Sequence, residues 1–258
     1  MHHLKSDRGK RLKVLNVWVD PVDMDQAVSR VEEFVERGDR PHAIFAVNPE
    51  KNFSVPKNPA LHETFRQADL LIPDGIGVVY AARLLHKARL KRVPGVELMA
   101  AICSLAAKKG YKVFLYGAKE EVNRGAAEEL VRRYPGLNIV DRCNGYVKEQ
   151  EMPALVERIN ASQADILFIA LGSPRQEDWY ARHREALRTV RVVQGIGGTL
   201  DTIVGTVKRA PAFWCRLNGE WLYRLLSEPK RIHRQRVLPL FALDVLLEKV
   251  KKTLQAGG

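Results

Sequence analysis

Short runs of β-branched and apolar residues alternate with amphipathic stretches through most of the chain, and this alternation constrains the fold more than any other feature. Strands that alternate with helices pair in parallel, because each helix returns the chain to the start of the next strand. We therefore predict an α/β fold with a mainly parallel sheet flanked by helices. The runs with strand character are Val14–Val19, Ala43–Val47, Leu70–Ile72, Lys112–Tyr116, Asn138–Val140, Ile166–Leu171 and Val190–Val193.

Two of the intervening helices have clear end signals. Asp23 is a typical N-cap residue, with Gln26 three positions later and an apolar stripe after it. A second helix is expected from Val96 to Lys109, where Gly110 provides a stop signal. These signals place helices on both sides of the predicted strands.

The C-terminal segment differs from the body in charge. The chain has a net charge of +12, and residues 207–258 carry eleven Lys/Arg against four Asp/Glu. Trp214 and Trp221 recur there with leucines at helical spacing, and a second amphipathic stretch runs from Leu243 to Leu254. Tryptophan beside basic residues is typical of a helix that lies in a membrane interface, although rings packed onto the α/β body would give the same pattern.

This difference predicts two parts, an α/β core over residues 1–206 and a basic helical appendage over residues 207–258. The three cysteines are odd in number and lie far apart, which disfavours a disulfide framework or a zinc site and favours a reducing cytoplasm. The apolar run from Val237 to Leu247 is too short to cross a bilayer, and the N-terminus has no signal peptide pattern. A soluble or peripheral protein is expected.

Ligands of open parallel sheets bind beyond the carboxyl ends of the strands, so polar residues just after strands are the first site candidates. Asp74 is the sharpest of them, because a carboxylate beside glycines can take a proton from a bound hydroxyl group. Its alternative role is to cap a helix that begins near Ile76. Four segments occupy such positions: Asn48–Glu50, Pro73–Gly77, Gly172–Glu177 and Gln194–Gly198.

The last of these segments is rich in glycine. Gly195, Gly197 and Gly198 can bring backbone N–H groups to a diphosphate or a ribose, and Asp201 can hold a sugar diol. No glycine cluster completes the GxGxxG pattern, since Leu200 stands at the third glycine position here. A dinucleotide-dependent dehydrogenase is therefore disfavoured.

Taken in order, the motifs resemble those of the WecG/TagA/CpsF glycosyltransferases, carbohydrate-active family 26. The resemblance covers nearly the whole chain, and the order and spacing of the motifs make it specific. It rests on Asn48–Glu50, Ala68–Gly77, Arg92–Leu98, Gly172–Glu177, Gly195–Asp201, Lys208–Pro211, Glu220–Arg224, Glu228–Arg231 and Arg234.

The resemblance implies a Rossmann-like core and an inverting transfer from a UDP-sugar, typically UDP-N-acetylmannosamine. The implied acceptor is the 4-hydroxyl of N-acetylglucosamine on undecaprenyl diphosphate, in the synthesis of teichoic acid or another cell-surface polysaccharide. The appendage is implied to touch the anionic inner face of the cell membrane and to close over the site. The resemblance also implies that the reaction needs no metal cofactor.

Roles for single residues follow from the same resemblance. Asp74 matches the base, Asn48 and Gln176 line the pocket, and Arg92 helps to fix a substrate. The planar fork of arginine suits a diphosphate, because it pairs two oxygens and stays charged. Three appendage arginines are implied to reach that diphosphate: Arg224, Arg231 and Arg234.

Three positions depart from the family pattern and leave the donor sugar open: Ala46 replaces a common threonine, Lys91 an acidic residue and Leu200 an aromatic one. Asp23 and Asp25 have the DxD form of many metal-dependent glycosyltransferases, but helix capping explains Asp23 better, so no metal is expected.

Two other classes of protein compete with the enzyme. Net positive charge suggests a nucleic-acid-binding protein, but no zinc-finger, RRM or KH signature is found, so a nucleic-acid partner is not expected. A catalytically silent nucleotide-sugar-binding protein is the second alternative, motivated by Ala46. The sequence is compatible with a homo-oligomer.

Overall fold

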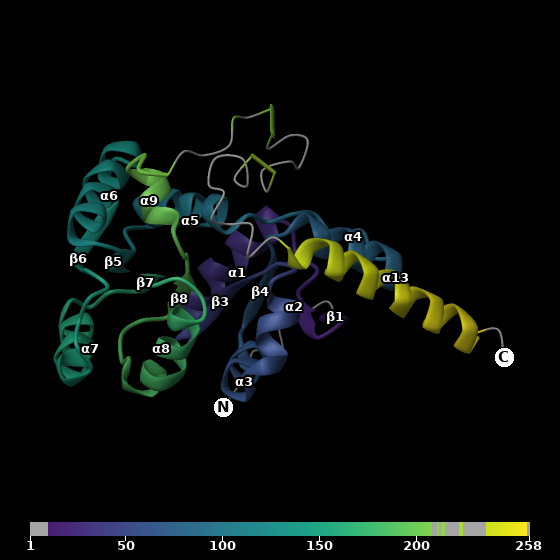
Figure 1. Cartoon of the computed structure of the whole chain (residues 1–258). Coiled ribbons are helices and arrows are strands. Elements are labelled where there is room, and N and C mark those ends of the chain that lie inside the picture. The colour runs from purple at the N-terminus through teal and green to yellow at the C-terminus, as the bar shows by residue number, and fades with distance from the viewer. Residues whose placement is uncertain (1–9, 208–210, 212, 215–221, 224–235, 257–258) are drawn as a thin grey trace.

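A six-stranded parallel sheet forms the centre of the molecule (Figure 1). The computed structural model describes residues 10–207, 211, 213, 214, 222, 223 and 236–256. The strand order is β4-β3-β8-β7-β5-β6, and every pair is parallel, so the predicted α/β fold is confirmed. The strands are β3 (His42–Val47), β4 (Leu70–Pro73), β5 (Lys112–Gly117), β6 (Asn138–Cys143), β7 (Ile166–Ala170) and β8 (Val192–Gly195).

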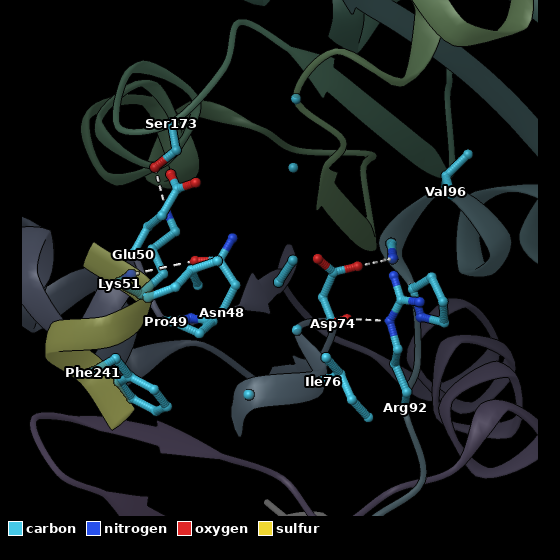
Figure 2. A pocket seen from close by; sticks show the side chains of 18 of the residues that line it. Asn48, Pro49, Glu50, Lys51, Asp74, Ile76, Arg92, Val96, Ser173 and Phe241 are labelled. Carbon is cyan, nitrogen blue, oxygen red and sulfur yellow. Dashed lines mark hydrogen bonds between the residues drawn. The ribbon is translucent and has the colours of Figure 1, made fainter. Parts of the chain in front are cut away.

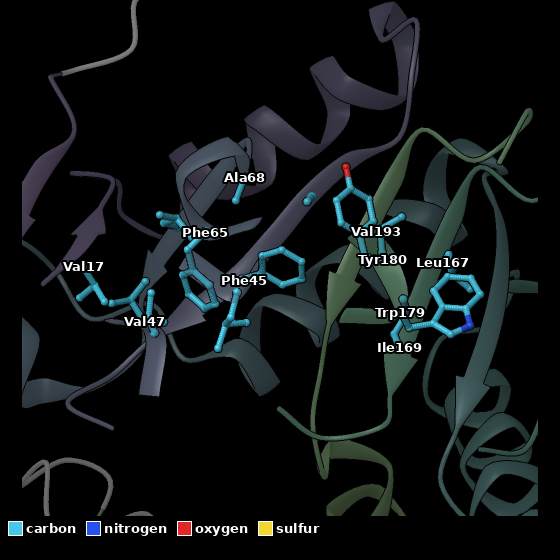
Figure 3. Close-up of a cluster of buried hydrophobic side chains, with 14 of the residues drawn as sticks. Val17, Phe45, Val47, Phe65, Ala68, Leu167, Ile169, Trp179, Tyr180 and Val193 are labelled. Carbon is cyan, nitrogen blue, oxygen red and sulfur yellow. The ribbon is translucent and has the colours of Figure 1, made fainter. Parts of the chain in front are cut away.

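Helices cover both faces of this sheet, because alternate strand residues point to opposite sides and most are apolar. One face packs against α1 (Met24–Arg37), α5 (Gly95–Lys109) and α6 (Glu120–Arg133). The other packs against α3 (Pro59–Gln67), α4 (Ile76–His86), α7 (Met152–Ala161) and α8 (Arg175–His183). Figure 3 shows Phe45, Phe65, Trp179 and Tyr180 in this second layer.

The remaining elements, of which α13 is the longest, complete this description. They are β1 (Leu12–Val14), β2 (Val17–Val19), α2 (Lys51–Ser54), α9 (Thr199–Ile203), α13 (Val237–Ala256) and the 3₁₀ turns Val55–Lys57, Glu149–Glu151 and Arg184–Ala186.

The predicted helix ends are confirmed. The Gln26 N–H donates to Asp23 Oδ1 at 3.1 Å, and the Asp23 N–H donates to Gln26 Oε1 at 2.9 Å, which completes a capping box. Gly110 ends α5 with a φ of 74°, a backbone conformation that glycine adopts without steric cost.

Three strand predictions are wrong in detail, and one of them is β6, which extends to Cys143 where Asn138–Val140 was predicted. Val14–Val19 is not one strand: the chain turns at Leu15, whose φ is 53°, and β1 and β2 pair as an antiparallel hairpin outside the main sheet. A continuous apolar run cannot distinguish one strand from two that fold back on each other. The last strand begins at Val192 and not at Val190, and it ends in the glycine turn.

The C-terminal helix α13 packs along α4 (Figure 1). Phe241 and Val245 are buried against the α4 side of the core, whereas Leu243, Leu247 and Leu254 are more than half exposed. Among the described residues, no helix is both long enough and apolar enough to cross a membrane. The boundary near residue 207 remains a prediction.

Candidate active site

A cavity of about 870 Å³ lies beyond the carboxyl ends of β3, β4, β7 and β8. All four segments predicted from the sequence contribute to its lining. Figure 2 labels Asn48, Asp74 and Ser173 from three of them. The register of the strands explains why these segments lie together. Val47 at the end of β3 pairs with Pro73 at the end of β4, so the next residues, Asn48 and Asp74, lie side by side at this edge of the sheet. Ile169 likewise pairs with Gly195, which brings the loops after β7 and β8 together.

Asp74 is held on both sides by the start of α5 and the loop before it. Its Oδ1 atom accepts a hydrogen bond of 2.8 Å from the Gly95 N–H, and its carbonyl oxygen accepts one of 2.6 Å from Arg92 Nε (Figure 2). A helix N-terminus favours a negative charge, so this contact stabilises the ionised carboxylate. The alternative capping role is wrong, because Gly75 is the N-cap of α4 and no side chain caps that helix.

Arg92 also lines the cavity, from the loop between α4 and α5. Its hydrogen bond to the Asp74 carbonyl fixes the turn that presents the carboxylate. Its contact with a substrate remains a prediction.

The turns that carry Asn48 and Asp74 touch each other. A Cβ atom on Gly75 would lie 2.9 Å from Pro49 Cδ and 3.0 Å from Asn48 Cβ, so only glycine permits this approach. The Asn48 side-chain oxygen accepts the Lys51 N–H at 3.3 Å, which ties it to the first turn of α2. The local fold therefore requires the glycine that the sequence places beside Asp74.

Gln176 packs onto the glycine turn after β8. Its Oε1 atom accepts a hydrogen bond of 2.9 Å from the Gly197 N–H, and its side chain is buried. Because Gln176 receives the Gly197 N–H here, any N–H contact of this turn with a diphosphate or a ribose would come from its other residues, and that contact remains a prediction. Gly198 precedes α9, and Asp201 on that helix lines the cavity, as predicted for a residue that could meet a ligand.

Lys51 was missed in the sequence analysis, and Glu177 was named there only as the end of a candidate segment, without a role. Lys51 Nζ lies 2.9 Å from Glu177 Oε1, and the side chains are 8% and 1% exposed. Lys51 also donates to the Ser173 hydroxyl (Figure 2). Their only sequence signal was adjacency, since Lys51 follows the Asn48 motif and Glu177 follows Gln176.

The described lining is acidic. It contains four carboxylates and two cations, a formal net charge of −2, and both cations hold protein groups. A diphosphate therefore needs positive charge from elsewhere. The arginines predicted for that role, Arg224, Arg231 and Arg234, lie outside the described residues.

The two aspartates of the DxD motif, Asp23 and Asp25, do not line the cavity. Asp23 accepts the Gln26 N–H and pairs with Lys91 Nζ at 3.0 Å, and these two contacts lower the pKa of its carboxyl group. Among the residues that the structure describes, no three His, Cys, Asp or Glu side chains gather as metal ligands would.

The outer wall of the cavity is apolar. Tyr80 and Leu84 come from α4, and both are exposed. Phe241 and Leu246 come from α13, and a Cβ atom on Gly77 of α4 would lie 3.6 Å from the Phe241 ring. The cavity thus has a polar floor on the sheet and an apolar rim on two helices.

Comparison with known proteins supports a common function for these features. The sequence matches the family model described as the glycosyl transferase WecG/TagA/CpsF family over residues 12–255. Three similar relatives are all named N-acetylglucosaminyldiphosphoundecaprenol N-acetyl-beta-D-mannosaminyltransferase. The protein of Bacillus spizizenii is 38% identical over 203 residues, 79% of this chain and 78% of the relative. That of Bacillus subtilis is 37% identical over 211 residues, 81% of each chain, and that of Staphylococcus aureus is 34% identical over 242 residues, 93% and 94%.

Proposed function

This chain belongs to the WecG/TagA/CpsF family of glycosyltransferases, and we propose that it transfers N-acetylmannosamine from UDP to undecaprenyl-diphosphate-linked N-acetylglucosamine. The observation that carries the proposal is the position of Asp74, a carboxylate fixed at the floor of a cavity whose rim is apolar. A sugar nucleotide fits the polar floor, and a lipid-linked acceptor fits the rim. The names of the relatives supply the identities of donor sugar and acceptor.

The chemistry follows from one base and one leaving group. Asp74 takes the proton of the acceptor hydroxyl while the hydroxyl oxygen forms a bond to the anomeric carbon of the donor sugar. The bond from that carbon to the diphosphate oxygen breaks on the opposite face, so UDP leaves with the electron pair and the configuration inverts. The Gly95 N–H keeps the carboxylate oriented for this transfer.

Charge on the departing diphosphate requires cations that the described lining does not supply in excess. Arg224, Arg231 and Arg234 fill this role in the proposal, and no metal is needed. Their segment then completes the site only when it folds over the cavity. Such closure would limit idle hydrolysis of the donor.

The acceptor lipid implies contact with a membrane surface. α13 carries exposed leucines beside Lys249, Lys251 and Lys252, a combination that suits an anionic bilayer interface. Because α13 also forms part of the rim, a protein seated on the inner face of the cell membrane by this helix would present its cavity to the lipid headgroups. We propose this peripheral placement together with the activity.

A donor screen tests the activity. The protein is incubated with several UDP-sugars and a lipid-linked N-acetylglucosamine analogue, and the product is weighed by mass spectrometry. We expect a gain of one N-acetylhexosamine residue with UDP-N-acetylmannosamine. UDP binding without turnover of any donor would favour the silent nucleotide-sugar-binding protein.

The same screen addresses Ala46, which lines the cavity where relatives of this family often carry threonine. A product with a different UDP-sugar would reassign the donor while keeping the reaction class.

A further inference from the structure

Lys51 and Glu177 form an ion pair inside the wall of the cavity, and the chemistry above uses neither residue. Lys51 comes from α2 after β3, and Glu177 comes from α8 after β7. Their charged atoms are 2.9 Å apart, and both side chains are buried. The pair therefore links two strand ends that are far apart in the sequence.

A lysine in such a cavity would first be suspected of binding phosphate, but its surroundings do not favour this. The ammonium group of Lys51 donates to Glu177 and to the Ser173 hydroxyl, and it lies 5.0 Å from the centroid of the Phe65 ring. Protein groups thus occupy two of its three donors and its apolar side. These contacts assign the cation first to the protein.

The pair reaches one predicted site residue, Gln176, through Glu177, and another, Asn48, through the backbone of Lys51. The backbone N–H of Lys51 donates to Asn48 Oδ1 at 3.3 Å. Gln176 Nε2 donates to Glu177 Oε1 at 3.4 Å, and the other end of the same amide accepts the Gly197 N–H. Hydrogen bonds and the side chain of Lys51 together therefore connect the end of β3 to the glycine turn after β8.

Stability alone is a poor reason for this pair. A buried ion pair often stabilises a fold no better than apolar residues of similar size, because both charges lose their water. Glu177 Oε2 has no hydrogen-bond partner among the described residues, so the pair is not even fully satisfied. A role in the cavity is therefore the better explanation for the pair.

We propose that Lys51 and Glu177 are a positioning pair, which holds the amides of Asn48 and Gln176 at a fixed distance across the cavity. The proposal rests on the proposed function for its kinetic consequence. Without the pair both amides remain present but are displaced, so kcat falls more than the KM for the UDP-sugar changes.

The test removes both charges together, since removal of one would leave the other buried and unpaired. The variant is Lys51→Met with Glu177→Met. Its matched control is Arg11→Met with Asp20→Asn. This variant removes a largely buried ion pair whose charged atoms are 2.7 Å apart and which lies beside the start of β4, away from the cavity. Two quantities are measured, the steady-state rate and hydrogen exchange at the Gly197 amide by NMR, relative to core amides of β8.

We expect kcat to fall about tenfold or more, with KM changed less, and Gly197 exchange to accelerate about tenfold relative to the β8 core. The control should change neither quantity. Unchanged kcat, or a fall in kcat without faster exchange at Gly197, would overturn the positioning role. If the unmodified protein shows no transfer, the proposed function fails, while Gly197 exchange still decides whether the pair holds Gln176.

Discussion

The Asp74 carboxylate and the Gly95 N–H are joined by a hydrogen bond of 2.8 Å across 21 residues of sequence. The bond fixes one carboxylate oxygen at the start of α5, where the helix favours its charge. The position of the proposed base thus depends on α5 as well as on β4.

Replacing Asp74 with Asn should remove the base and preserve the Gly95 contact, since an amide oxygen can accept the same N–H. We expect transfer to fall by about 100-fold or more, as loss of a general base typically causes, while UDP affinity stays near normal. Steady-state kinetics and calorimetric UDP titration check this. Asp165→Asn is the matched control, because Asp165 also accepts a backbone N–H at 2.8 Å, from Lys112, and does not line the cavity. Unchanged turnover in the Asp74 variant would remove this residue from the mechanism.

Gly195→Ala should displace the Gln176 amide. The new Cβ atom would lie 2.5 Å from Gln176 Nε2, and a shift of about 1 Å in a site group can cost roughly 100-fold in rate. We expect a large loss of kcat with a cooperative thermal unfolding transition retained. Gly125→Ala on α6 is the control and should keep its activity. Wild-type kcat in the Gly195 variant would show that the position of Gln176 is not critical.

Exposed leucines of α13 should determine vesicle binding. Replacing Leu243, Leu247 and Leu254 with Gln removes apolar surface without touching the cavity lining, so binding to anionic vesicles should weaken by at least about tenfold. Sedimentation with vesicles measures it, and UDP affinity should stay unchanged. Val131→Gln, at an exposed apolar residue of α6, is the control. Equal vesicle binding of the α13 variant and the control would contradict the proposed membrane contact.

Asp69 should make stability depend on pH in the acid range. Burial raises the pKa of its carboxyl group, but His42, whose Nδ1 atom lies 3.2 Å from Asp69 Oδ1, and the hydrogen bonds from Arg40 outweigh burial and bring the pKa to about 2. Because the folded pKa is lower than the unfolded one, near 3.8, the stabilisation is present above about pH 4 and is lost as the pH falls towards 2.

The free energy involved is on the order of 2 kcal/mol. Asp69→Asn should therefore lose about this much stability at neutral pH and show a weaker acid dependence, measured by urea unfolding at several pH values. Asp39→Asn, at an exposed neighbour, should behave as the unmodified protein. If the free energy of unfolding fell equally at acid pH in the Asp69 variant and in the unmodified protein, this account would be contradicted.

EDTA should leave transfer nearly unchanged if arginines alone neutralise the diphosphate. Transfer is measured with and without chelator, followed by addition of Mn²⁺. A large loss restored by Mn²⁺ would revive a metal role, and Asp23→Asn would then test the DxD motif.

The parts of the site that follow from strand ends were predictable from the sequence. Asn48 and Asp74 meet because parallel strands end at one edge of the sheet, and that rule needs no coordinates. The bond between Asp74 and Gly95 was not predictable, because local sequence offered helix capping as the nearer partner. The contact between Lys51 and Glu177 joins residues 126 positions apart and leaves no periodic signal.

The C-terminal helix shows a second limit of prediction from the sequence. Its apolar periodicity is visible in the sequence, but periodicity does not say which face meets a neighbour. Phe241 and Val245 are buried against α4, while Leu243, Leu247 and Leu254 are more than half exposed. The prediction of a single strand over Val14–Val19 was wrong for a related reason, because apolar character alone does not reveal the turn at Leu15.

The cavity takes its floor from the sheet and part of its rim from α13, which begins some forty residues after β8. In the proposed function the floor carries the proton transfer and the rim meets the lipid, so the two tasks fall in separate stretches of the chain. We therefore expect that exchanging α13 between relatives changes the range of acceptor lipids and leaves the geometry around Asp74 intact.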